Sequence, residues 1–482
     1  MEIWRKTLIA FCLLMLSATC ICMGPRRAGA AEPPLIRVAL DEGIPAATFQ
    51  VAQGSYILVD TATGVSPGTP GRGEIWSITA SGTALLVQGG GLARAEPFQG
   101  PILLQAERRE ELNLFMYKNI QYRGDLVIQN LKGKLLVVNL LDLESYLYGV
   151  VGREMGGGAA PDAYCAQAVV SRSYALSMKG LNPWYDVGKD TGTQVYGGYT
   201  GEIAYAVNGR NPVVEAVERT RGEVLKYLGT LVRAFFHANA GGYTEDSENV
   251  WLESLPYLRG VPSPADAHAE SYGSWATGTY RWTQTVDRKN LEAKLGIGKI
   301  KEIRVSRNRT RVTRDPVTGK LSREFIPGTR TVSGRVTEVT IIGSEGKKSF
   351  YRDEIRTPFG LKSTLFDLGF EGELQVLNAN GETQALAGTD VYVLGNGNRL
   401  VSLQLDQGES YVAGRGNRVV STGGSFEKLT FTGRGHGHGV GLSQWGARGL
   451  AVEGYNYRQI LENYYNQGKH DGNLQIVGNY GS

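Results

Sequence analysis

Short strand-like segments separated by glycine-containing turns place the strongest constraint on the fold of the first part of the chain. Between Ile36 and Val138 these segments are rich in Val, Ile, Leu and Tyr, and they read IRVAL, SYILVD, EIWSITA, GTALLV, LNLFMY, DLVIQN and KLLVVN. β-branched and aromatic residues favour strands, and glycine permits the tight turns between them. The pattern predicts a β-rich N-terminal region over residues 31–132. No titratable constellation stands out in it, so we interpret it as a scaffold or a glycan-docking surface.

A mainly helical part follows from Asn139 to Thr220. Its clearest helix begins at Pro161, which suits the first helical position, and ends at Gly180. Strand-like segments return after it. The sequence therefore predicts an α+β protein in which a mixed helical and β core, residues 133–470, follows the β-rich region, with a short tail at 471–482.

One acid in the helical part has an unusual position. Glu154 follows the apolar run LYGVV and precedes the alanine-rich helix. Desolvation raises the pKa of a carboxyl group, and a raised pKa is what a general acid needs near neutral pH. The spacing alone also allows a solvated acid at a helix end, or an ion pair with Arg153 or Arg172, because most acids in proteins are not catalytic.

Arg172 lies well inside the predicted helix. A guanidinium there must find a carboxylate or line a polar cleft, because an unpaired buried charge is costly. A pair with Glu154 would lower the pKa of that acid and oppose a general-acid role. We therefore interpret Arg172 as an orienting or substrate-contacting residue.

The N-terminus has the pattern of a secretory signal. Arg5 and Lys6 precede the apolar run Leu8–Met23, and small residues from Ala28 offer a cleavage site. We expect residues 1–30 to be a signal peptide and the mature protein to act outside the cytoplasm, associated with the cell wall. Membrane contact is then expected only through an uncleaved signal.

Basic residues concentrate between Lys299 and Arg335, with eleven Lys and Arg against three acids. Alternation and the turn signal Asp315–Gly319 predict a protruding basic hairpin over 299–335. Two interpretations stay open: the arginines solvate an edge strand and discourage edge pairing, or they contact an anionic polymer such as a cell wall. We expect no nucleic acid as a partner, because aromatic residues do not interleave with the basic ones.

The last part of the chain has a second β-rich stretch and a glycine-rich block. Residues 374–424 predict an inserted β-rich stretch without evident chemistry. The block Gly433–Ala447 reads GRGHGHGVGLSQWGA, and its glycines let the backbone approach a ligand or another segment closely. Helices are predicted over Gln444–Val452 and Tyr457–Tyr465.

Two histidines of this block, His436 and His438, would point the same way on an extended strand. A metal site needs a further ligand, for which His237 in FFHANAGGYTE is the candidate. A glycan cleft lined by histidine, Gln444 and Trp445 is as reasonable, because sugars pack on aromatic faces and need polar groups that fix them.

Several segments, in a fixed order, resemble the stage II sporulation protein D family, which includes the amidase enhancer LytB. They run from about residue 130 to 466 and read VVNLLDLESYLYGVVGREM, AQAVVSRSYAL, DTGTQVYGGY, RTRGEVLKYLGTLVRAFFHANAGGYTEDSENVW, YLRGV, SGRVTEVTIIG, FGLKSTLF, GRGHGHGVGLSQWGARGLA and YRQILENYY. Motifs of this length in one order are highly specific.

The resemblance implies a role for several of these residues. Glu154 matches the family's catalytic glutamate, and Arg172 matches a position important for activity, with Tyr174 in the same motif. Gln194, Tyr196, His237, His436, His438, Gln444 and Trp445 fall in family motifs, and we assign them to substrate binding. Some relatives bind zinc through a cysteine-containing site. Because Cys165 is the only cysteine outside the predicted signal, we expect neither a metal nor another cofactor.

The family acts on peptidoglycan glycan strands, and some members are lytic transglycosylases that prefer strands stripped of stem peptides. The resemblance implies that Glu154 would protonate the glycosidic oxygen and then accept the proton of the muramoyl C6 hydroxyl. An ordinary glycosidase needs a second carboxylate, for which Asp190, Glu245 and Asp246 are lesser candidates. The alternative is a non-catalytic wall-binding enhancer of a cell-wall amidase.

Overall fold

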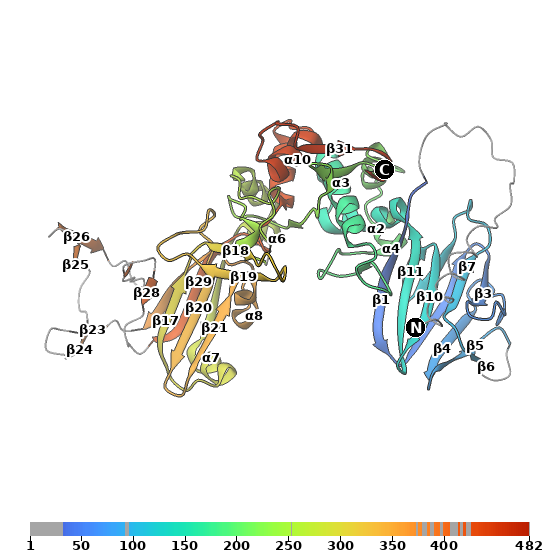
Figure 1. Ribbon diagram of the computed structural model, residues 1–482, viewed down its shortest axis with the longest axis horizontal. Coiled ribbons are helices and arrows are strands. Elements are labelled where there is room, and N and C mark those ends of the chain that lie inside the picture. The colour runs from blue at the N-terminus through green and yellow to red at the C-terminus, as the bar shows by residue number, and fades with distance from the viewer. Residues whose placement is uncertain are drawn as a thin grey trace. The chain divides into compact units, whose positions relative to one another are not determined.

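The computed structural model describes residues 32–91, 96–251, 253–372 and 426–481, and the backbone of short strands between 375 and 420. The predicted signal peptide lies outside the described residues, as do the turns of the predicted insertion. Helices and many strands are both present, which confirms the α+β prediction (Figure 1). Among the described helices, none has the length and apolar character needed to cross a membrane.

Two six-stranded sheets form the N-terminal part, as the strand-like segments predict. One has the order β12 (Val187–Gly188), β1 (Leu35–Ile44), β11 (Lys134–Asp142), β10 (Asp125–Leu131), β7 (Ile102–Ala106) and β3 (Tyr56–Asp60). The other has the order β6 (Glu96–Phe98), β5 (Ala84–Gln88), β4 (Ile75–Ser81), β2 (Ala46–Gln53), β8 (Leu114–Tyr117) and β9 (Ile120–Arg123). Alternate side chains of β1, β2 and β3 are buried, which is the period of a strand with one face on a core.

The N-terminal sheets and the helices share one hydrophobic core. The boundary predicted after residue 132 falls in the turn between β10 and β11, and β11 pairs with β1 along its length. That core continues into α2 (Leu143–Met155), α3 (Pro161–Met178) and α10 (Tyr457–Asn466). The β-rich region and the helical segment therefore pack as one body.

Helix α2 begins directly after β11, where the Asp142 side chain accepts the Ser145 N–H at 3.0 Å. Its position depends on Gly149, whose carbonyl accepts the Gly197 N–H at 2.9 Å. A Cβ atom at Gly149 would lie 2.8 Å from the Gly198 carbonyl oxygen. Only glycine therefore allows the chain before α4 (Gly198–Ile203) to lie directly against α2.

A second hydrophobic core lies further along the chain, between Trp282 and Phe431. Its three-stranded sheet has the order β16 (Arg281–Asp287), β29 (Phe426–Arg434) and β22 (Phe366–Gly372). A five-stranded sheet has the order β21 (Lys347–Tyr351), β20 (Glu338–Gly343), β17 (Ile300–Ser306), β28 (Arg418–Val420) and β27 (Ala413–Gly414). The strands β23 (Gln375–Leu377), β24 (Thr383–Ala385), β25 (Asp390–Gly395) and β26 (Arg399–Gln404) agree with the strand content predicted for 374–424.

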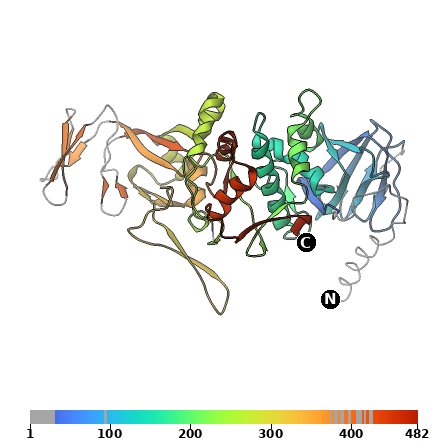
Figure 2. The same ribbon diagram turned by 90° about the horizontal axis from the view of Figure 1, so that it is seen from above.

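The basic hairpin is shorter than the range 299–335 that the sequence predicts. It consists of β18 (Thr310–Arg314) and β19 (Leu321–Phe325), whereas β17 belongs to the five-stranded sheet (Figures 1 and 2). Its turn is stabilised by Asp315, whose Oδ1 accepts the N–H groups of Val317 and Thr318 at 2.9 and 2.7 Å.

Shorter elements complete the two cores and the chain between them. They are α5 (Pro212–Arg219), β13 (Val224–Tyr227), β14 (Thr230–Leu231), β15 (Phe236–His237), η1 (Ser247–Asn249), η2 (Pro264–Tyr272), α6 (Ser274–Tyr280), α7 (Arg288–Leu295), η3 (Arg352–Ile355), α8 (Arg356–Phe359), β30 (Leu442–Ser443), β31 (Leu474–Val477) and η4 (Asn479–Gly481). The parallel pairing of β15 with β30 places His237 opposite Ser443. It thereby joins two of the motifs that the sequence singled out.

The glycine-rich block is not the extended strand that we expected for His436 and His438. β29 ends at Arg434, and the glycines at 435, 437, 439 and 441 have φ between 72° and 102°. Such values strongly favour glycine, and they turn the chain at every second residue. The predicted close approach is confirmed, because a Cβ at Gly441 would lie 2.1 Å from the Phe235 carbonyl oxygen. The predicted helix α9 (Gln444–Val452) follows, and α10 ends one residue beyond its predicted end.

Candidate active site

A cleft of about 1030 Å³ brings together residues from the N-terminal helices, the middle of the chain and the glycine-rich block. Of the residues that the sequence singled out, Glu154, Tyr174, His237, His436, His438 and Gln444 line it. Aromatic side chains of Phe235, Phe236 and Trp251 form part of the wall. The combination of flat aromatic faces with a few polar groups is suited to a sugar polymer.

Glu154 lies in the last turn of α2 and is half-buried. Burial raises its pKa from 4.5 to about 7, while hydrogen bonds from Val195 and Gln444 oppose the shift. Its place at the negative end of the helix acts in the same direction as burial. The carboxyl group is thus poised to give up and take back a proton near neutral pH.

The two oxygens of Glu154 have different surroundings. Oε1 accepts the Val195 N–H at 2.6 Å, whereas Oε2 has a longer contact of 3.4 Å with Gln444 Nε2. Both partners are N–H donors, and because the contact with Val195 is the shorter, Oε2 is the oxygen better placed to carry the proton in the neutral acid. No ion pair of Glu154 with Arg153 or Arg172 occurs in the described structure.

Gln444 is oriented by a second glutamine. In α3, Gln167 donates from Nε2 to Ser171 Oγ at 2.9 Å, so its Oε1 is free to accept from Gln444 Nε2 at 3.4 Å. The Gln444 amide therefore directs its NH₂ group toward both Gln167 and Glu154. This contact links the glycine-rich block, 290 positions along the chain, to the acid.

His237 and His438 lie side by side, with ring centroids 5.3 Å apart. His237 Nδ1 faces the Val440 carbonyl at 3.1 Å and must therefore carry the hydrogen, whereas His438 Nδ1 accepts the Val440 N–H at 3.1 Å. Burial lowers the pKa of His438 to about 4 and that of His237 well below its usual value. Both imidazoles are neutral, and His237 Nε2 has no hydrogen-bond partner in the described structure.

The described residues do not form a metal site around these histidines. Backbone groups of Val440 occupy Nδ1 of both His237 and His438. Cys165 is buried on α3 with its Sγ 3.8 Å from the Ala216 carbonyl oxygen, and it is not part of the cleft. Among the described residues, no group of three or more His, Cys, Asp or Glu is placed to hold a metal ion.

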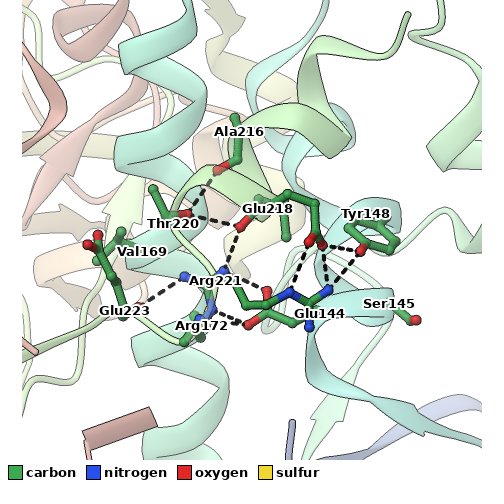
Figure 3. Close-up of polar contacts among 12 residues, drawn as sticks. Glu144, Ser145, Tyr148, Val169, Arg172, Ala216, Glu218, Thr220, Arg221 and Glu223 are labelled. Carbon is green, nitrogen blue, oxygen red and sulfur yellow. Dashed lines mark hydrogen bonds and ion pairs between the residues drawn. The ribbon is translucent and has the colours of Figure 1, made fainter. Parts of the chain in front are cut away.

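Arg172 is not part of the cleft lining, and Figure 3 shows it in a cluster of polar contacts with Glu144 and Glu223. Its guanidinium is fully buried and forms a two-pronged ion pair with Glu144, at 2.9 Å to Oε1 and 2.6 Å to Oε2. It also donates to the carbonyls of Glu223 and Val217, and Glu144 accepts the Gly222 N–H at 3.0 Å. This geometry disagrees with substrate contact by Arg172, because every oxygen that it reaches belongs to the protein interior.

Three further predicted site residues also lie away from the cleft surface. Tyr196 is buried and donates to Asn139 Oδ1 at 2.8 Å, and Gln194 is buried and accepts from Tyr146. Trp445 packs among His268, Tyr272, Trp275 and Arg448 rather than against Glu154. Gln194 and Tyr196 flank Val195 in sequence and hold the loop whose backbone reaches the acid.

The lesser carboxylate candidates are not part of the cleft lining. Asp190 is exposed and accepts the Gly192 N–H. Glu245 is fully buried, where it accepts hydrogen bonds from Ser333 and Asn249. Asp246 faces arginines at 3.8 and 3.6 Å. The acids that do line the cleft besides Glu154 are Glu253, Asp353 and Glu354.

Comparison with known proteins places this site in a family. The family model described as stage II sporulation protein matches residues 131–227, which contain Glu154 and its Val195 partner. The amidase enhancer of Bacillus subtilis (strain 168) is 28% identical over 328 residues, or 66% of this chain. The chain spans only 39% of the length of that relative.

Two further relatives match over more of their own length. Stage II sporulation protein D of Bacillus subtilis (strain 168) is 24% identical over 68% of this chain and 74% of the relative. An uncharacterised protein of Brachyspira hyodysenteriae is 26% identical over 73% of each. These matches confirm the predicted resemblance to the stage II sporulation protein D and amidase enhancer family, and they place a domain of that family at residues 131–227.

The buried pair gives a first prediction, about stability. Removing either partner alone, by Glu144→Leu or Arg172→Met, leaves an uncompensated buried charge and should cost about 3–5 kcal/mol of unfolding free energy. The double variant should recover most of that loss. Denaturant unfolding of the three variants measures these values. If the double variant were folded but no longer bound glycan strands, Arg172 would be a substrate contact after all.

A second prediction concerns pH. The folded protein holds the Glu154 proton more tightly than the unfolded chain, so its contribution to stability is lost as pH rises from about 4.5 to about 7. Glu154→Gln is neutral throughout, so its unfolding free energy relative to that of wild type should rise by about 3 kcal/mol across this window. Denaturant unfolding at several pH values measures the difference. Asp190→Asn, an exposed acid, is the control, and parallel curves for Glu154→Gln and wild type would contradict the assignment.

Proposed function

Because the chain contains a stage II sporulation protein D domain, we propose that it cleaves the glycan strands of peptidoglycan as a lytic transglycosylase. The proposal places the protein outside the cytoplasm, at the cell wall, in sporulation or wall remodelling. Strands stripped of stem peptides are its proposed substrate. The relatives named for sporulation and for amidase enhancement support the cell-wall role.

One observation carries the proposal of catalysis. Glu154 lies in a cleft with aromatic walls, and burial raises its pKa to about 7. A carboxyl group used only for structure would gain from a cationic partner, and Glu154 has instead the neutral donors Val195 N–H and Gln444. This combination of accessibility, raised pKa and fixed orientation is what a residue with both acid and base steps requires.

The proposed reaction needs no second carboxylate. Glu154 donates the Oε2 proton to the bridging oxygen as the bond between this oxygen and muramoyl C1 breaks. The C6 hydroxyl oxygen of the same sugar then bonds to C1, and the ionised Glu154 takes the hydroxyl proton. Water is not consumed, the proton returns to the enzyme, and the product has a 1,6-anhydro end. The two neutral donors, the Val195 N–H and the Gln444 amide, stabilise the carboxylate between these steps. Because neither carries a charge, the carboxylate can still take back a proton.

A second candidate function is supported by the name of one relative, the amidase enhancer. In that case the same cleft binds glycan without cleaving it, and a cell-wall amidase is the partner. The raised pKa of Glu154 favours the enzyme, because a binding cleft has no need of a titrating acid.

The third prediction concerns the rate at which the Glu154→Gln variant cleaves glycan strands. This variant keeps the size of the side chain and the Val195 contact but cannot donate a proton as an acid. We expect its rate of strand cleavage to fall by at least about 10²-fold, since general acid catalysis contributes 10²–10⁴-fold. The measurement is the release of soluble fragments from purified strands with and without stem peptides.

Glu253→Gln and Asp190→Asn serve as controls, one for an acid in the cleft and one outside it. Each should retain activity near that of wild type. Wild-type binding to strands without any cleavage would favour the enhancer. Loss of activity in Glu253→Gln equal to that in Glu154→Gln would indicate a two-carboxylate hydrolase.

A further inference from the structure

Four arginines belong to the lining of the cleft that holds Glu154. They are Arg233, Arg323, Arg352 and Arg356. Two of them are neutralised by acids of the same lining: Arg356 contacts Asp353 at 2.9 Å, and Arg233 faces Glu253 at 3.7 Å. Neither Arg323 nor Arg352 has an ion-pair partner in the described parts of the chain.

The Arg352 guanidinium is held in place by contacts that leave its charge unmatched. It donates to Thr310 Oγ1 at 3.3 Å and lies 4.9 Å from the centre of the Phe325 ring. Its Nε is buried without a hydrogen-bond partner among the described residues. Burial lowers the pKa of Arg352 to about 10, and the like charge of Arg323 contributes to the same shift.

Arg323 reaches the cleft because of the register of β19. Leu321, Arg323 and Phe325 lie on one face of this strand, with Leu321 and Arg323 in the cleft lining and Phe325 against Arg352. Glu324 is on the other face, where it pairs with Arg311 at 2.9 Å. The basic hairpin therefore presents Arg323 to the cleft, whereas Arg311 on its outer face is paired with Glu324.

We propose that Arg323 and Arg352 form a subsite for the free lactyl carboxylate of a muramic acid residue in the glycan strand. The proposal rests on the proposed function and adds to it the group that selects the substrate. Two guanidiniums without an acid partner in the lining of one cleft are an anion site, and planar guanidinium donors match a carboxylate in shape and charge. The lactyl carboxylate is the anionic group that a stripped strand carries on every second sugar.

This subsite would explain why stem peptides matter. In a substituted strand the lactyl group is an amide, which has lost the negative charge and continues into a peptide. The arginines would then lose their ionic partner, and the peptide would have to pass between the hairpin and the η3 segment. Glu354, the acid whose charge acts on Arg352, is exposed and forms no ion pair with Arg352 within the described residues.

The test is a binding measurement in the full-length Glu154→Gln protein, in which strands are not consumed. Stripped strands are compared with the same strands whose lactyl carboxylates have been converted to methylamides. We expect methylamide conversion to weaken binding about tenfold, and Arg352→Gln or Arg323→Gln to weaken binding of unmodified strands by a similar factor. Neither substitution should weaken binding of the methylamide strands further, because the group they recognise is already gone.

Arg311→Gln is the matched control, since it removes the same charge from the outer face of the hairpin. It should leave the preference for unmodified strands intact. Equal binding of the two strands, or an equal loss for both in the Arg323 and Arg352 variants, would overturn the subsite. Arg323 is exposed, so its substitution should not disturb folding. The comparison of the two kinds of strand uses the Glu154→Gln protein without any further substitution. The subsite can therefore be tested even if one arginine variant misfolds.

Cleavage by the wild-type protein, measured in parallel, separates this proposal from the proposed function. Cleavage together with indifference to the lactyl charge would overturn the subsite and leave the enzyme standing. Selective binding of unmodified strands without cleavage would support the subsite in a binding protein.

Discussion

The buried ion pair between Glu144 and Arg172 holds together the part of the molecule on which the site depends. It joins α2 to α3, and through backbone groups of Val217, Gly222 and Glu223 it also fixes the end of α5 and the start of β13. Helix α2 carries Glu154 two turns and more beyond Glu144. The same helix therefore has one buried glutamate whose charge is matched by an arginine and another, Glu154, that has no cationic partner among the described residues.

The difference between these two acids lies in their partners. Glu144 faces a guanidinium and a backbone N–H, which stabilise its charge. Glu154 has a backbone N–H and a glutamine amide, neither of which carries charge, and its pKa stays raised. The raised pKa of Glu154 thus depends on keeping cations away from its carboxyl group, and none of the cleft arginines forms an ion pair with it within the described residues.

The sequence predicted the part of the site that local patterns encode. The position of Glu154 after an apolar run, the starts and ends of α3 and α9, and the close approach allowed by the glycines all follow from neighbouring residues. The partner of Arg172 could not be predicted in this way, because Glu144 is 28 positions away and the helices meet only through the tertiary fold. The register that turns Arg323 toward the cleft likewise depends on pairing with β18.

Trp445 and the histidines are further residues whose positions could not be predicted from the sequence. A tryptophan next to Gln444 is a reasonable sugar platform, yet one step along a helix changes the face by about 100°, and Trp445 packs against Arg448 and Tyr272. The alternation of histidine with glycine favours an extended strand, but the positive φ of each glycine bends the chain instead. Loop conformation of this kind is set by the contacts that surround it.

The central claim is that Glu154 acts as both acid and base in a cleavage without water. The most direct test is to cleave stripped strands with the wild-type protein in ¹⁸O-labelled water and to weigh the muramoyl ends by mass spectrometry. We expect anhydro ends that contain no ¹⁸O, because the C6 oxygen of the sugar takes the place of water. Reducing ends that carry ¹⁸O would contradict it and would identify the protein as a hydrolase.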